Sequence, residues 1–159
     1  MKINKTNALR LLDQKKISYE IKTYQYDEDH LSGEHIIGQV DLKGDAIYKT
    51  LVLHDKSEYL VCCIPVLEEI DLKKLAKATK HKSVAMIPQK DLLKITGYIR
   101  GGCSPIGMKK QYPTFIQKDI VNQTEVAFSA GKRGMQMIVA PNDIINVTGA
   151  TLVDVIKKA

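Results

Sequence analysis

Two strongly apolar stretches with only four polar residues between them constrain the fold of this chain more than any other feature. The stretches run from Ala46 to His54 and from Tyr59 to Val66, and the residues between them read Asp55-Lys56-Ser57-Glu58. Two parallel strands need a connection of roughly a dozen residues or more, whereas antiparallel strands can be joined by a short turn. The two stretches are therefore predicted to form an antiparallel β-hairpin.

Further elements flank this hairpin, and many of the strands are connected too directly for a regular alternation of strands and helices. We expect helices at 4–16, 32–40, 72–79 after the N-cap residue Asp71, 90–94 after Pro88, and after Pro141-Asn142-Asp143. We expect strands at 17–25, 83–87, around Ile99, and at 114–117, 126–129 and 135–140, and the final helix leads to a C-terminal segment at 151–156. The sequence thus predicts an α+β fold, a single domain over residues 1–159 in which one curved, mixed sheet is surrounded by helices.

Length and composition are those of an ordinary globular domain. The chain has 159 residues, of which 44% are hydrophobic and 26% are charged, so disorder is not expected. No apolar run approaches the roughly 20 residues of a membrane-spanning helix, and the N-terminus lacks the apolar core of a signal peptide. Two of the three cysteines, Cys62 and Cys63, are adjacent in a predicted strand and would point to opposite faces. We therefore expect reduced cysteines, a cytoplasmic location and no membrane partner.

Basic residues are clustered along the chain, which has a net charge of +6. The clusters are Lys73, Lys74, Lys77, Lys80, His81 and Lys82, then Lys109–Lys110, and Lys132–Arg133. Such clusters attract polyanions through counterion release, which favours a nucleic-acid partner. A solvated surface with no such partner is the alternative interpretation. No zinc-finger spacing or aromatic RNA-binding signature accompanies the charge.

Lys49 interrupts an otherwise apolar strand. By strand parity, its own face also carries Ile47, Leu51 and Leu53. An ammonium group on a buried face is costly unless it is paired. Lys49 therefore either reaches solvent from an edge strand or lines a cleft that binds a phosphate, a carboxylate or an ester carbonyl. Residues 44–50 are similar in outline to a phosphate-binding P-loop, but Tyr48 replaces the glycine that such a loop needs, so we exclude a nucleotide hydrolase.

Glycines are concentrated in two segments. In the first, Gly97, Gly101, Gly102 and Gly107 surround Cys103-Ser104-Pro105. Glycines let backbone amides approach a ligand closely, and amides can stabilise the oxyanion that develops in acyl transfer. Tight turns or a bulged strand would explain the same glycines. The second segment, 131–134, lies between two predicted strands and is interpreted as a hairpin turn whose charges could meet a phosphate backbone.

Other arrangements that carry chemistry are not supported by the spacing of the residues. The cysteine or serine of the glycine-rich segment could pair with one of the four histidines, but nothing in the sequence fixes such a pair. His30 and His35 together with the adjacent cysteines match no zinc pattern, so we expect no metal and no cofactor. Glu68–Glu69 is interpreted as solvated surface.

Taken in order, these segments resemble the YbaK/EbsC family of tRNA deacylases, which is similar to the editing domain inserted in bacterial prolyl-tRNA synthetases. The segments span nearly the whole chain: Thr6-Asn7-Ala8, Thr23-Tyr24, Tyr48-Lys49-Thr50-Leu51, Leu72-Lys73-Lys74, Thr96-Gly97-Tyr98, Gly101-Gly102-x-Ser104-Pro105-x-Gly107 and Ser129-x-Gly131-Lys132-Arg133-Gly134. Each segment alone is weak evidence for the family, whereas the full set in this order is specific to it. The resemblance implies a partly barrel-like mixed sheet, with a pocket at its open side for the aminoacyl ester of the terminal adenosine of tRNA.

The resemblance also implies which residues form the site. Lys49 matches the essential lysine of the family, which is expected to anchor the terminal nucleotide or the ester. Gly102 matches a glycine that helps to position the ester. The residues expected to contact the substrate are Tyr24, Thr50, Gly101, Ser104, Ser129 and Asp143. Those expected to contact tRNA are Lys73, Lys74, Lys77, Lys132 and Arg133.

The activity that the resemblance implies is removal of cysteine from mischarged tRNA(Pro), and also from tRNA(Cys), by a trans-acting editing protein. The thiol of the substrate would attack the ester, so that a pocket that orients it needs no protein nucleophile. Cys103 stands where we expect an apolar residue, which leaves a protein thiol near the site as an alternative. Two other functions are alternatives: a deacylase for alanine or another small amino acid, and a non-catalytic binding module. Prolyl-tRNA synthetase is a second expected partner beside aminoacyl-tRNA.

Overall fold

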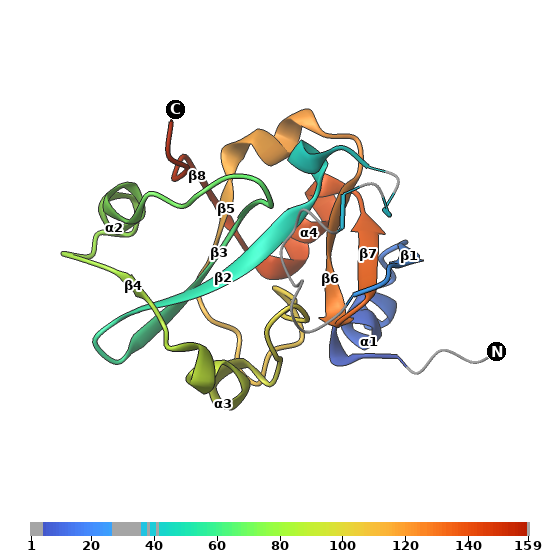
Figure 1. Cartoon of the computed structure of the whole chain (residues 1–159), viewed down its shortest axis with the longest axis horizontal. Coiled ribbons are helices and arrows are strands. Elements are labelled where there is room, and N and C mark those ends of the chain that lie inside the picture. The colour runs from blue at the N-terminus through green and yellow to red at the C-terminus, as the bar shows by residue number, and fades with distance from the viewer. Residues whose placement is uncertain (1–4, 27–35, 38, 41, 159) are drawn as a thin grey trace.

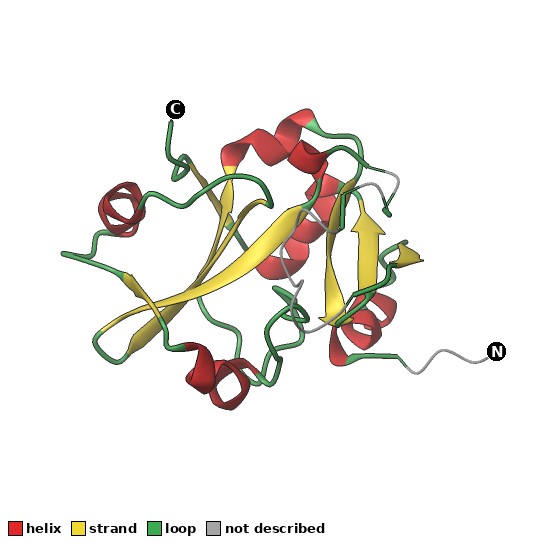
Figure 2. Cartoon of the chain, viewed as in Figure 1, coloured by secondary structure: helices red, strands yellow, loops and turns green. Residues whose placement is uncertain are grey.

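The computed structural model describes residues 5–26, 36–37, 39–40 and 42–158 (Figures 1 and 2). The helices of this part of the chain are α1 (Asn7–Gln14), α2 (Leu72–Thr79), α3 (Leu92–Thr96) and α4 (Pro141–Thr148), with short 3-10 helices at Gly44–Ala46, Gln89–Asp91 and Lys118–Asn122. The strands are β1 (Glu20–Thr23), β2 (Tyr48–Asp55), β3 (Glu58–Pro65), β4 (Ala85–Met86), β5 (Thr114–Gln117), β6 (Val126–Lys132), β7 (Met135–Val139) and β8 (Thr151–Val153). The expected α+β fold class is confirmed.

The predicted hairpin is the longest feature of the molecule, and it is formed by β2 and β3. Its antiparallel register runs from Tyr48 opposite Pro65 to Asp55 opposite Glu58. The hairpin is the centre of a sheet with the order β4-β2-β3-β5-β8. β5 lies parallel to β3, and β8 lies parallel to β5, so this sheet is mixed.

The described strands are divided between two sheets, whereas the sequence analysis expected one. The second sheet has the order β1-β7-β6 and is antiparallel throughout. Among the described residues, one parallel bridge, between Ile47 and Ala127, joins the two sheets. β2 and β6 run in different directions from there (Figure 1), as expected for twisted strands.

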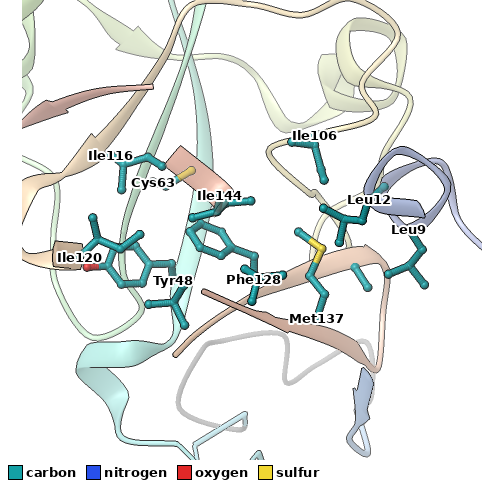
Figure 3. Close-up of a cluster of buried hydrophobic side chains, with 14 of the residues drawn as sticks. Leu9, Leu12, Tyr48, Cys63, Ile106, Ile116, Ile120, Phe128, Met137 and Ile144 are labelled. Carbon is teal, nitrogen blue, oxygen red and sulfur yellow. The ribbon is translucent and has the colours of Figure 1, made fainter. Parts of the chain in front are cut away.

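The main core lies between the two sheets, where the Tyr48 and Phe128 rings stack with centroids 5.4 Å apart. Ile144 of α4 packs into the same cluster, and Figure 3 shows these side chains together. Leu9 and Leu12 bring α1 against it, so that side of the helix is fully buried. A second cluster on the hairpin is covered by α2 and contains Leu53, Leu60, Cys62, Leu75 and Ala76.

Local signals were reliable at several helix ends. The Asp71 carboxylate accepts hydrogen bonds from the amides of Lys73 and Lys74, which confirms it as the N-cap of α2. The final helix begins at Pro141 itself. None of the helices in the described part of the chain has the length and apolar character that crossing a membrane requires.

Two expected elements differ from the structure. Ile99 is not in a strand, because Gly97 ends α3 at φ 87° and Gly101 turns the chain again at φ 82°. Within the helix expected at 32–40, the described residues Ile37 and Val40 form an isolated β-bridge instead. The rest of that expected helix, including His35, lies outside the described residues, as does His30.

Candidate active site

A cleft of about 470 Å³ opens beside the first half of β2. It is bounded by β2, the segment that follows β3, the glycine-rich loop, β6 and β7. Its lining residues are Ile36, Tyr48, Lys49, Thr50, Leu51, Val66, Leu67, Glu68, Glu69, Arg100, Gly101, Cys103, Ser129 and Gln136.

The cleft lies where β2 has an open edge. Along the edge of β2 that faces away from β3, β4 pairs at Leu53 and His54. At the other end of this edge, Ile47 makes one bridge to Ala127. Between these points, the outer edge of residues 49–51 is paired with no strand of the described chain. Irregular backbone of the glycine-rich loop approaches here instead, which leaves room for a ligand.

Lys49 lies on a wall of this cleft and is partly buried. Burial lowers the pKa of its ammonium group, and the carboxylates of Glu69 and Glu68 oppose that shift. Among the described residues, no carboxylate lies within 4.0 Å of the ammonium to form an ion pair with it. Lys49 is thus an incompletely compensated cation in a partly desolvated cleft, where interactions with an anion or a carbonyl oxygen are stronger than in water.

The cleft brings together four of the residues expected at the site: Lys49, Thr50, Gly101 and Ser129. Thr50 lies opposite Cys63 in the hairpin, and its hydroxyl is 3.7 Å from that sulfur. Ser129 lies in β6 just before a bulge, and its hydroxyl accepts a hydrogen bond from the Gly131 amide at 3.2 Å.

Gly102 lies next to the cleft but does not line it. Its amide donates a hydrogen bond to the Ile99 carbonyl at 2.9 Å, so this amide is already engaged. A Cβ atom at Gly102 would lie 3.1 Å from the Arg133 nitrogen and 3.2 Å from the Lys132 carbonyl carbon. The observable role of Gly102 is therefore to let the glycine-rich loop contact the backbone of the β6–β7 hairpin, and its expected role in positioning the ester stays a prediction.

Three of the expected substrate contacts are placed away from the cleft lining. Tyr24 follows β1, where its amide donates to the Gly134 carbonyl, and its side chain packs on an apolar cluster that also contains Val66 of the cleft lining. Ser104 is fully buried, and its hydroxyl has no hydrogen-bond partner among the described residues. Asp143 lies in the first turn of α4. None of the three is among the residues that line the cleft.

The basic residues expected to bind tRNA differ in their availability. Lys73, Lys77 and Lys132 are exposed. The Lys74 ammonium instead donates to the Ile156 carbonyl at 2.9 Å and so holds the C-terminal segment. Arg133 donates from Nε to the Arg100 carbonyl at 2.8 Å, which ties the β6–β7 turn to the glycine-rich loop.

Gln136, a cleft residue that was not singled out from the sequence, carries a buried polar atom, Oε1, without a partner in the described chain. The Tyr48 hydroxyl has no partner there either, but the Tyr48 ring packs in the main core on Phe128, on the face of β2 opposite Lys49, with its hydroxyl beside Ile120 (Figure 3). Both residues are 2% exposed. An unsatisfied buried polar atom costs about 1–3 kcal/mol, and a ligand that donates a hydrogen bond to Gln136 Oε1 would remove that cost. The available signal for Gln136 was a polar residue between Met135 and Met137 in an apolar strand.

Other lining residues that were not expected at the site come from two further segments. Glu68 and Glu69, which were interpreted as solvated surface, form part of one wall, and Arg100 belongs to the glycine-rich loop. Glu69 is exposed, as expected, and Glu68 is partly exposed. The segment that carries them turns after β3 and pairs with the residues that follow β8, since Ile70 forms a bridge to Ile156.

The histidines and cysteines of the described chain form no nucleophilic pair in the cleft. Cys103 lines it, but burial raises the pKa of its thiol to about 12, so the thiol is protonated at neutral pH. Neither His54 nor His81 is a lining residue; His81 binds Asp55 at 2.8 Å. No group of three His, Cys, Asp or Glu side chains suited to a metal ion occurs within the described ranges. A second cleft, beside the turn of the β2–β3 hairpin, contains none of the expected site residues.

Comparisons with known proteins identify the family of this chain. Residues 34–147 match the family described as the aminoacyl-tRNA editing domain. The chain is 44% identical over 155 residues to an Enterococcus faecalis protein named as a candidate Cys-tRNA(Pro)/Cys-tRNA(Cys) deacylase, EbsC, and the alignment covers 97% of this chain and 94% of that protein.

Solved structures share the fold. The hypothetical protein APE2540 superposes with a TM-score of 0.86 at 15% identity, over 96% of this chain and 100% of that one. A candidate trans-editing enzyme for prolyl-tRNA synthetase superposes with a TM-score of 0.83 at 16% identity, over 98% and 100% of the two chains. Since the family match covers most of the sequence and the Enterococcus relative is similar along nearly all of it, the chain belongs to the aminoacyl-tRNA editing domain family, which confirms the resemblance found in its motifs.

Proposed function

We propose that this protein is a trans-acting aminoacyl-tRNA deacylase that removes cysteine from mischarged tRNA(Pro) and also from tRNA(Cys). The observation that carries the proposal is the cleft that holds Lys49 beside Thr50, Gly101 and Ser129. Membership of the editing family supports the deacylase activity, and the name of the Enterococcus relative supports cysteine as the amino acid.

The cleft supplies groups that suit cleavage of an ester at the end of a nucleic acid. Lys49 offers a partly desolvated cation for the ester carbonyl or the terminal phosphate. The Gln136 oxygen offers a buried polar atom without a partner in the described chain. These groups are held by strands β2 and β7, so their positions are fixed before the substrate binds.

The nucleophile in this proposal is the thiol of the substrate. Its sulfur forms a bond to the ester carbonyl carbon, the carbon–oxygen bond to the terminal ribose breaks, and the thiol proton ends on the released tRNA hydroxyl. A thiol reacts without a dedicated protein base more readily than a hydroxyl does. The raised pKa of the Cys103 thiol supports this assignment, because a protonated, buried thiol is a poor nucleophile.

The remaining expectations complete the proposal. The exposed lysines Lys73, Lys77 and Lys132 contact the phosphate backbone of tRNA. Prolyl-tRNA synthetase is the proposed protein partner, because the misacylated tRNA(Pro) is released there. We also propose a cytoplasmic location, where both tRNA and synthetase are found.

A deacylation assay with a panel of substrates tests the proposal. Cys-tRNA(Pro), Cys-tRNA(Cys), Ala-tRNA(Pro), Ser-tRNA and Pro-tRNA(Pro) are incubated with the protein, and loss of the labelled amino acid is followed. We expect the fastest loss from the cysteinyl substrates. Faster loss from Ala-tRNA(Pro) would assign the protein to alanine editing. Binding of tRNA without any hydrolysis would refute the enzymatic function.

A further inference from the structure

The walls of the cleft differ in charge. The segment after β3 contributes Glu68 and Glu69, and the glycine-rich loop contributes Arg100. The Arg100 carbonyl is bonded to Arg133, and Lys132 is exposed beside it, so positive charge continues outside the cleft on that side. A ligand in the cleft therefore meets carboxylates from the segment after β3 and a cation from the glycine-rich loop.

Of the two carboxylates, Glu68 is the one available to a ligand. Glu69 Oε2 lies 3.4 Å from Lys157 Nζ, and the Glu69 side chain is 76% exposed. Glu68 is partly buried, and its carboxylate has no hydrogen-bond or ion-pair partner in the described part of the chain. Glu69 and Glu68 both oppose the fall in the pKa of the Lys49 ammonium, so Glu68 lies near Lys49 although it forms no ion pair with it.

The backbone that carries Glu68 is fixed on both sides. The Glu68 amide donates to the Pro65 carbonyl at 3.0 Å, and the Glu69 carbonyl accepts from the Lys157 amide at 2.8 Å. Ile70 adds a bridge to Ile156. The backbone that carries the carboxylate is therefore anchored, and only the Glu68 side chain has to be ordered when it binds a cation.

We propose that Glu68 binds the α-ammonium group of the aminoacyl ester and makes the cleft selective for esters with a free amine. This inference rests on the proposed deacylase function. The charges of an aminoacyl-tRNA are complementary to those of the cleft, since its ammonium lies on one side of the ester and its phosphates lie on the other. With the ammonium on Glu68, the ester lies beside Lys49 and the phosphates extend toward Arg100. The reverse orientation would place phosphates against carboxylates.

The consequence is a substrate class defined by charge. Esters whose amine is blocked, such as N-acylated aminoacyl-tRNA or peptidyl-tRNA, lack the cation and leave the Glu68 carboxylate without its partner. A hydrogen bond to a charged group is strong enough to produce about a tenfold preference for the free amine. Glu68 thus acts on specificity, while Lys49 acts on the ester itself.

The test compares Cys-tRNA(Pro) with N-acetyl-Cys-tRNA(Pro), for the wild type and for the Glu68→Gln and Glu69→Gln variants. The assay is run at about pH 6.5, where an α-amino group is protonated. We expect the wild type to cleave the free-amine substrate about tenfold faster. The Glu68→Gln variant should lose this preference, whereas Glu69→Gln should keep it, because the Glu69 side chain is 76% exposed and pairs with Lys157.

Two results would overturn the inference. If Glu68→Gln slows the deacylation of both substrates equally, the carboxylate acts through Lys49 or through the fold and does not bind the α-ammonium group. If Glu68→Gln retains the tenfold preference for the free amine, another residue binds the α-ammonium group.

Failure of the proposed function is recognised separately. If the wild type cleaves no aminoacyl-tRNA, binding of 3′-(cysteinylamino)-3′-deoxyadenosine and of its N-acetyl form is measured instead. An ammonium-dependent affinity that is lost in Glu68→Gln would support the Glu68 inference without any catalysis. Equal affinities of the wild type for the two forms would refute it.

Discussion

Replacing Lys49 by methionine separates the chemical role of its ammonium group from the structural role of its side chain. Methionine keeps the length and the apolar stem of lysine but removes the charge. Lys49 is partly buried at the open edge of β2, so the stem contributes to packing that the variant preserves. Any loss of activity in Lys49→Met then reports on the cation alone.

The size of the effect follows from the position of the ammonium. A unit charge at about 4 Å from a developing negative charge contributes about 4 kcal/mol at an effective dielectric constant of about 20. The cleft is open to water, which screens part of this interaction. We therefore expect Lys49→Met to reduce kcat/KM by more than about tenfold, or about 1.4 kcal/mol.

Although Lys49→Met should lose activity, its thermal stability should not fall. Burial lowers the folded-state pKa of Lys49, so the folded protein disfavours the charged form relative to the unfolded chain. That cost is present at any pH below the folded-state pKa, and it fades as the pH rises toward the unfolded value. Lys49→Met should therefore have an equal or slightly higher Tm at neutral pH.

Single-turnover deacylation of Cys-tRNA(Pro) and thermal melts at neutral pH provide the measurements. Lys49→Arg is the matched control, since it keeps the charge but changes its geometry, and it should retain part of the activity. A Lys49→Met protein with wild-type activity would refute the proposed role. A Tm that falls together with the activity would mean that the lysine mainly supports the fold.

Three further predictions concern the nucleophile, the tRNA surface and the glycine-rich loop. Cys103→Ala should retain most of the activity, and seryl-tRNA should be a far poorer substrate than cysteinyl-tRNA in the deacylation assay. Removing the exposed charges of Lys73 and Lys77 should weaken tRNA binding and flatten its salt dependence, measured by filter binding. Gly102→Ala should lower the free energy of unfolding by about 1–3 kcal/mol, because its Cβ would crowd the Arg133 nitrogen at 3.1 Å; denaturant titration measures this.

Each of these predictions has a result that contradicts it. A folded but inactive Cys103→Ala protein would assign the chemistry to a protein thiol. An unchanged salt slope would show that tRNA lies away from α2, and Lys74→Ala is the control there, since its ammonium is engaged by the Ile156 carbonyl. A Gly102→Ala protein with unchanged stability and no activity would indicate that Gly102 acts directly on the ester.

The sequence alone determined the features that depend on neighbouring residues. The β2–β3 hairpin was predictable because two apolar stretches flank a connection too short for a crossover. Asp71 could be assigned as an N-cap because capping involves residues only two or three positions apart. Lys49 stood out for a similar reason, since a charge within an apolar strand is costly unless the fold gives it a use.

The sequence was less reliable where glycines interrupt a pattern. The apolar residues around Ile99 suggested a strand, but Gly97 and Gly101 adopt positive φ angles that turn the chain. Periodicity cannot register such turns, because it counts side chains and not backbone conformations. The division of the strands into two sheets was equally invisible, since it depends on where distant strands diverge.

Only the tertiary structure decided which residues share the cleft. Glu68, Arg100 and Gln136 come from three separate segments, and no spacing in the sequence relates them. Conversely, Ser104 belongs to a matched motif, yet the fold buries it completely. A cleft is formed by the packing of elements far apart in the chain, so its composition follows from the register and twist of β2, β6 and β7 and from the turns that bring loops against them. Local sequence specifies the elements, but these long-range contacts specify the site.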